Sequence, residues 1–98
     1  MSDNQILIPP SFLELFMDPA KRKLLVSHDE VIARYEWCED MTNMLTETAK
    51  EVQFSLGLSE EAVMERMALG LQSPQAACTE QEAGWVCLRL AELLNWSA

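Results

Sequence analysis

Apolar residues recur at helical spacing along most of the chain, and these patterns are preceded by a serine or threonine. A hydroxyl side chain in front of a helix accepts a hydrogen bond from a free N–H group of the first turn, and a glutamate three positions later completes a capping box. Full capping boxes begin at Ser11, Ser27 and Thr79, and Ser59 is followed by two glutamates. The sequence therefore predicts four helix starts.

Residues that end helices follow the same patterns, at Asp18-Pro19, Gly57 and Ser73-Pro74. Starts and stops together predict an all-α fold, a single small bundle of four to five helices. The expected elements are a short helix near residues 11–17, a further helical turn over 19–25, a long helix over 28–56, a third helix over 60–72 and a last helix over 80–95. Residues 1–10 are expected to form a flexible or extended arm, and residues 11–98 a single helical domain.

The long predicted helix has one face of apolar or small residues at alternating steps of four and three. These residues are Val31, Tyr35, Cys38, Thr42, Leu45, Ala49, Val52 and Leu56. At about 1.5 Å per residue the helix would extend ~40 Å, more than the roughly 30 Å width of a small domain. We expect part of it to overhang, bend or pack against a second copy.

The last predicted helix is apolar on several sides. Its three apolar faces are Ala83, Cys87, Leu90 and Leu94; Val86, Leu90 and Leu93; and Gly84, Leu88 and Ala91. The remaining strip is Trp85, Arg89, Glu92 and Trp96, in which Arg89 is placed to pair with Glu92 or stack on an indole. Because a small domain covers only some of these faces, we expect this helix to lie centrally in the fold or to face a partner, most simply a second copy in a homodimer.

Trp85, Arg89, Leu93 and Trp96 are the predicted partner-binding residues, because aromatic and arginine side chains supply much of the energy at interfaces. The alternative interpretation, in which the tryptophans close the domain's own core, stays open. The favoured function is a non-catalytic, cytosolic interaction or regulatory protein. It would be homodimeric and would bind a still unknown protein through an apolar helix face, as an adaptor or in a chaperone-like way.

The net charge of −9 argues against direct contact with nucleic acid or anionic lipid, because an acidic surface repels phosphate groups. The basic cluster at residues 21–23, KRK, is either a solvated turn or short helix, or a docking patch for an acidic surface. No apolar run approaches the roughly 20 residues needed to cross a bilayer, and no signal peptide is evident at the start. Three cysteines without CxxC spacing fit reduced thiols, so we expect a cytoplasmic protein.

Reactive side chains are most concentrated in HDEVIARYEWCED, residues 28–40. His28 and Cys38 would lie ~15 Å apart along one helix and cannot share an ion there. A zinc site that adds Cys78 and Cys87 lacks the short paired spacings of structural zinc, and the adjacent acids are typical of a solvated helix face. The glycines are isolated and no GxxxxGK(S/T) motif occurs. The sequence therefore predicts no catalytic, metal or cofactor site, and no enzyme.

The stretch LGLSEEAVMERM, residues 56–67, is similar to the turn and second helix of a DNA-binding helix-turn-helix, which would place such a unit at 49–68. Positions that would face a DNA groove include Glu60, Glu61, Met64 and Glu65. Their charges oppose phosphate, so we expect the shape without DNA binding. The alternative functions are an acidic mimic of nucleic acid and a transcriptional regulator derived from this unit.

The segments IPPSFLELF, VIARYEWCEDM and EAGWVCLRLAELLNW together resemble a group of short proteobacterial proteins of about this length, many of which carry the label of ATPase with chaperone activity. The resemblance spans most of the chain. It implies a small stand-alone bacterial protein, and it carries no functional residue over to this sequence.

Overall fold

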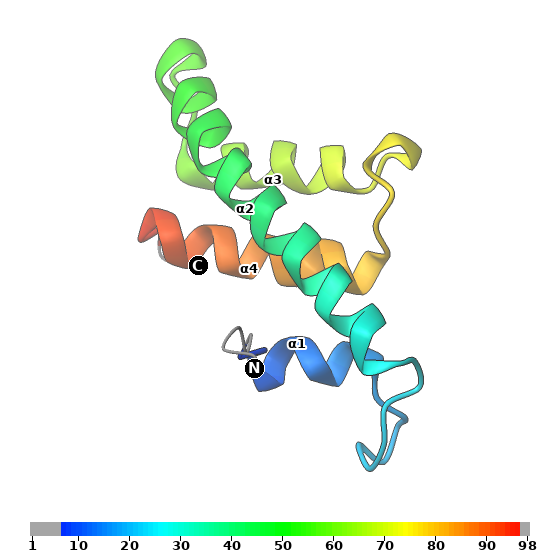
Figure 1. Cartoon of the computed structure of the whole chain (residues 1–98). Helices are drawn as coiled ribbons and strands as arrows, with labels where there is room; N and C mark the ends of the chain where they lie inside the picture. The colour runs from blue at the N-terminus through cyan, green and yellow to red at the C-terminus, as the bar shows by residue number, and fades with distance from the viewer. Residues whose placement is uncertain (1–6, 97–98) are drawn as a thin grey trace. The chain divides into compact units, whose positions relative to one another are not determined.

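A computed structural model describes residues 7–96 of the chain, and over that range the protein is all-α, as the sequence predicts (Figure 1). The α-helices are α1 (Pro10–Leu13), α2 (His28–Leu56), α3 (Glu60–Leu71) and α4 (Glu80–Leu94), and the 3₁₀ turns are η1 (Glu14–Phe16) and η2 (Pro74–Ala76). The long helix α2 has the predicted limits, while α3 and α4 each end one residue earlier than predicted. Residues 7–9 of the predicted arm have no regular structure, and its first six residues lie outside the described range.

Three of the four predicted caps form. Thr79 and Glu82 make the complete capping box of α4, in which each backbone N–H donates to the other side chain at 3.0 Å. Ser59 accepts from the N–H of Ala62 at 3.1 Å, and Ser27 accepts from the N–H of Glu30 at 3.1 Å. These local hydrogen bonds explain why the starts of the three longer helices follow directly from the sequence.

The cap predicted at Ser11 is wrong, because α1 begins earlier, with Pro9 as its N-cap and Pro10 as its first residue. Proline suits this position, since its fixed φ is already helical and it has no N–H group to leave unpaired. The short helix expected near residues 11–17 is instead one α-helical turn followed by the 3₁₀ turn η1.

Left-handed residues end two of the longer helices. Gly57 has φ +63°, and the N–H groups of Gly57 and Leu58 both donate to the carbonyl of Gln53, at 2.9 and 3.3 Å. After α4, Asn95 has φ 60° and the N–H of Trp96 donates to the carbonyl of Ala91 at 2.9 Å. Both are Schellman-type ends, which bring the residue after the cap back against the last turn of the helix.

Two compact units divide the chain, Met1–Trp37 and Cys38–Ala98. The boundary lies within α2, which continues through it without interruption. The single domain predicted for residues 11–98 therefore stays a prediction.

In the first unit, the buried ring of Phe12 is the centre of an aromatic group. Its centroid lies 5.4 Å from that of Phe16 and 5.3 Å from that of Tyr35, which it meets edge-on. Tilted and edge-on pairs at these distances are favourable because the positive edge of one ring meets the negative face of the other. The aromatic group thus ties α1 and η1 to the first turns of α2.

The helical turn predicted over 19–25 is wrong. Residues 17–25 form a tight loop in which Met17 and Leu24 make an isolated antiparallel bridge. The carboxylate of Asp18 accepts from the N–H groups of Arg22 and Lys23, at 2.7 and 3.2 Å. An aspartate that binds backbone groups ahead of it competes with helix formation, which is why this segment turns instead of coiling.

The second unit is a small bundle of the rest of α2 with α3 and α4. Its core cluster consists of Ala49, Val63, Met67 and Leu90, one or two from each helix. Partly buried residues surround this cluster: Leu45, Val52, Leu58, Met64, Leu94 and Trp96. Helices α3 and α4 lie side by side and are joined by the loop that contains η2 (Figure 1).

Most of the apolar face predicted for α2 is buried or partly buried. Cys38 and Ala49 are fully enclosed, and the hydroxyl of enclosed Thr42 donates to the carbonyl of Cys38 at 2.7 Å, so this polar atom is satisfied. Leu56 is the exception, because it is more than half exposed at the last residue of the helix. The periodicity therefore predicted which face of α2 is buried, but it did not predict that this face becomes exposed at Leu56.

Candidate functional site

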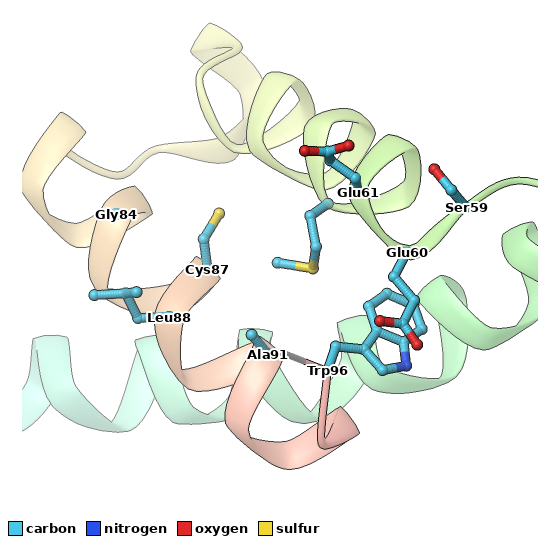
Figure 2. Close-up of a pocket in the computed structure, with 9 residues that line it drawn as sticks. Ser59, Glu60, Glu61, Gly84, Cys87, Leu88, Ala91 and Trp96 are labelled. Carbon is cyan, nitrogen blue, oxygen red and sulfur yellow. The ribbon is translucent and has the colours of Figure 1, made fainter. Parts of the chain in front are cut away.

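An apolar groove of about 610 Å³ lies in the second unit between the start of α3 and one face of α4 (Figure 2). The residues that line it are Ser59, Glu60, Glu61, Met64, Gly84, Cys87, Leu88, Ala91 and Trp96. Ligand sites in proteins are typically concave and mostly apolar with a few polar groups, in this range of volume. We define these nine residues as the α3–α4 groove.

One wall of the groove is the face of α4 that carries Gly84, Leu88 and Ala91, at steps of four and three. The seven steps from Gly84 to Ala91 correspond to ~10 Å of helix, or two turns. Leu88 is 67% exposed, although it stands on a helix whose other sides hold core residues. This wall is therefore apolar surface that the described chain leaves largely uncovered.

Gly84 leaves open space in this wall, because no heavy atom outside its own helix turn lies within 4 Å of where a Cβ would be. A glycine inside a helix costs about 1 kcal/mol relative to alanine. The contacts within the described chain supply no steric reason for that cost. A residue without a side chain permits the close approach of another backbone, which is the property that the groove gains here.

Trp96 closes part of the groove because of the way α4 ends. The left-handed conformation of Asn95 and the hydrogen bond from Trp96 to Ala91 turn the chain back toward the helix. The indole packs against the core cluster and also lines the groove beside Ala91. A local backbone motif thus determines where this aromatic side chain lies.

The other wall carries two negative charges, on Glu60 and Glu61, the first two residues of α3. Both side chains are exposed and sit where the partial positive charge of a helix N-terminus favours acids. Met64, one turn later, contributes the apolar part of this wall. The groove is therefore apolar in its walls and negatively charged along the α3 side.

Cys87 lines the groove with a partly buried thiol. Burial raises the pKa of this thiol above its ordinary value, and the electrostatic interaction with the thiol of Cys78 raises the pKa further. A raised pKa disfavours the thiolate, which is the nucleophilic form of cysteine. Cys87 therefore acts as a small apolar residue of the wall, and Cys38, which is fully buried, is likewise a core residue.

The four predicted partner-binding residues differ in their exposure and in whether they line the groove. Trp85 is only 8% exposed and offers a partner almost no area, so the alternative in which it closes the core describes its position. Leu93 is 41% exposed but does not line the groove. Trp96 is the one predicted residue that does.

Arg89 is held by two carboxylates within the second unit. It contacts Glu92 at 3.1 Å, the pair expected from the sequence, and Glu39 of α2 at 3.4 Å. The hydrogen bond that Arg89 donates to the carboxylate of Glu92 is the main cause that raises the pKa of Arg89. Burial lowers this pKa, and the charge of Glu39 raises it further. Because the guanidinium is partly exposed, each pair is worth less than ~1 kcal/mol. Arg89 therefore links α4 to α2, and its guanidinium is already paired with two carboxylates of the same chain.

The residues of the α3 wall were missed as a binding surface, although the sequence held a signal for them. Glu60, Glu61 and Met64 are positions that the helix-turn-helix comparison placed on the outward face of the second helix. A short connection, residues 57–59, joins α2 to α3 within the range of the predicted unit. The face that would read DNA in such a unit lines the apolar groove in this protein.

Residues 7–96 match neither of two further kinds of functional feature, a metal site and a membrane-spanning helix. No group of three histidine, cysteine or acidic side chains in this range is arranged to hold a metal ion. None of the helices in it combines the length and the apolar character that a bilayer-spanning segment needs. Comparisons with protein-family models, with curated proteins and with solved structures found no match. The α3–α4 groove is the candidate site on geometric grounds.

Proposed function

We propose that the protein is a non-catalytic binding protein that takes a helical segment of a partner protein into the α3–α4 groove. The observation that carries this proposal is the two-turn apolar wall of α4, with an exposed leucine at Leu88 and open space at Gly84. Recognition of an amphipathic helix by an apolar groove is a common mode of protein binding, in which residues at steps of three and four supply the contacts.

Burial of this wall supplies the driving force for binding. Complete burial of a leucine side chain is worth roughly 1.5–3 kcal/mol, and most of Leu88 is free to be covered. Trp96 and Met64 add large, polarisable surfaces at the same site. These terms favour a partner with large apolar side chains on one helix face.

The titratable groups of the groove favour binding over catalysis. Burial raises the pKa of the Cys87 thiol, which disfavours the thiolate, the nucleophilic form. The carboxylates of Glu60 and Glu61 lie exposed in the first turn of α3. Exposed carboxylates beside an apolar wall suit ion pairs with a basic partner, which is a binding role.

A pair of matched variants tests the proposal. Leu88→Glu changes the groove wall, whereas Leu69→Glu makes the same change at a leucine of α3 that is 68% exposed and does not line the groove. We expect proteins from the native lysate that are retained by the immobilised wild type and by Leu69→Glu to be lost from Leu88→Glu. Equal capture by the two variants would remove the groove from the function.

The homodimer expected from the sequence is a separate proposal, and light scattering at several concentrations tests it. A constant monomer mass would exclude the homodimer.

The alternative of nucleic-acid mimicry predicts association with a basic DNA-binding protein that weakens steeply with added salt. Capture that is independent of salt and requires Leu88 would exclude mimicry.

A further inference from the structure

We infer that the partner segment is a basic amphipathic helix, whose apolar face covers the α4 wall while lysines or arginines beside that face meet Glu60 and Glu61. This inference rests on the proposed function and adds the chemistry of the partner. It follows from the two properties that the groove combines, an apolar wall on α4 and a charged edge on α3.

The charge of the groove favours a basic partner. The nine groove residues include two glutamates and no lysine or arginine, and the whole chain has a net charge of −9. Charges at the rim of an interface speed association with a complementary partner and disfavour partners of the same sign. A basic helix satisfies both carboxylates, whereas an acidic helix with the same apolar face is repelled by them.

The size and shape of the groove suit a short stretch of helix. The α4 wall spans ~10 Å, which matches two turns of a partner helix. The open space at Gly84 allows the partner backbone to approach at one end, and the volume of about 610 Å³ accommodates several large side chains. A helix with two or three apolar residues at steps of three and four fits these dimensions.

A second copy of this chain fits the groove less well. A twofold contact places the same surface of both copies together, so each Glu60 and Glu61 would face an equally acidic partner. The basic cluster of the chain, residues 21–23, lies in the loop held by Asp18 and not on a helix. A basic helix from another protein is therefore the better match.

Three model peptides test the inference with the whole chain. They share one helical pattern of leucines and differ only at the flanking positions, which are lysine, glutamine or glutamate. We expect the lysine peptide to bind about tenfold more tightly than the glutamine peptide at low salt, and the glutamate peptide to bind most weakly. Anisotropy of a labelled peptide measures the affinity, and added salt should narrow the differences.

Variants of the protein assign this preference to the groove. The double variant Glu60→Gln/Glu61→Gln should remove the advantage of lysine over glutamine. Glu80→Gln is the matched control, since Glu80 is exposed at the first position of α4 and does not line the groove. Leu88→Glu should weaken the binding of all three peptides, and Leu69→Glu should weaken none. Circular dichroism confirms that each variant is folded.

The outcomes separate the inference from the proposed function. Equal binding of the three peptides that is lost in Leu88→Glu would overturn the basic partner and leave the groove as the binding site. A lysine preference that survives both Leu88→Glu and the double glutamine variant would overturn the inference, because it would reflect the acidic surface in general. Absence of any Leu88-dependent binding would overturn both. Self-association abolished by Leu88→Glu would make the second copy the occupant.

Discussion

Two faces of α4 have the same apolar character in the sequence but differ in burial in the structure. Ala83, Val86 and Leu90 are buried, and Leu90 belongs to the core cluster with residues of α2 and α3. Gly84, Leu88 and Ala91 line a groove, with Leu88 mostly exposed. Apolar composition shows that a face needs cover, but the neighbouring helices decide whether the chain itself supplies it. The uncovered face is the one on which a binding function can be built.

The largest effect is expected at the buried face. Leu90→Ala should lower the free energy of unfolding by about 2–5 kcal/mol, because it leaves a cavity in the core cluster. Chemical denaturation followed by circular dichroism measures the loss. Leu93→Ala, at a position that is 41% exposed, should cost clearly less. Similar losses in the two variants would mean that the two positions do not differ in burial.

A smaller loss is expected at the start of α4, which supports both faces. Thr79→Ala removes the side-chain half of the capping box and should cost about 1 kcal/mol. The control is Thr46→Ala, because the Thr46 hydroxyl donates to a carbonyl within α2 and caps no helix. That variant should stay within ~0.5 kcal/mol of the wild type in the same denaturation experiment. An equal loss in both would contradict the role of the cap.

At the groove face, Gly84→Ala should have opposite effects on folding and on binding. Alanine is the better helix former and its Cβ meets open space, so the free energy of unfolding should rise by ~0.5–1 kcal/mol. The same Cβ enters the groove and should weaken binding of the lysine peptide. Gly70→Ala, also helical with open space around it, should leave peptide binding unchanged. A loss of stability in Gly84→Ala would mean that the added Cβ clashes with neighbouring atoms and does not meet open space.

Leu88→Ala should change stability little, within ~0.5 kcal/mol, because the side chain is 67% exposed. Its contrast with Leu90→Ala, two positions away on the same helix, is the sharpest test of the difference between the two faces. The same denaturation measurement applies. A loss as large as that of Leu90→Ala would show that the groove face is core.

The smallest effect concerns the thiol between these faces. The pKa of Cys87 is raised in the folded protein, so above the ordinary thiol pKa the unfolded chain loses this proton first. The free energy of unfolding should therefore fall with rising pH, from about pH 8.5 upward. Cys87→Ala should show a shallower fall over that range than the wild type. Identical slopes would mean that burial does not perturb this thiol.

Local sequence determined the limits of the longer helices. The caps at Ser27, Ser59 and Thr79 and the left-handed end at Gly57 act within one turn of chain, so their hydrogen bonds form between neighbours in the sequence. The prediction failed over 11–25, where a proline start and the side chain of Asp18 replaced the expected cap and helical turn.

Only the tertiary structure decided which apolar residues became core and which became groove. Trp85 and Trp96 were equal candidates in the sequence, but Trp85 is enclosed while the end of α4 turns Trp96 into the groove. Likewise, periodicity placed Leu88 and Leu90 on an apolar helix but did not predict which of the two would be buried. Burial depends on contacts between residues far apart in the chain, and periodicity describes one helix at a time. For that reason the site was readable only from the arrangement of α3 against α4.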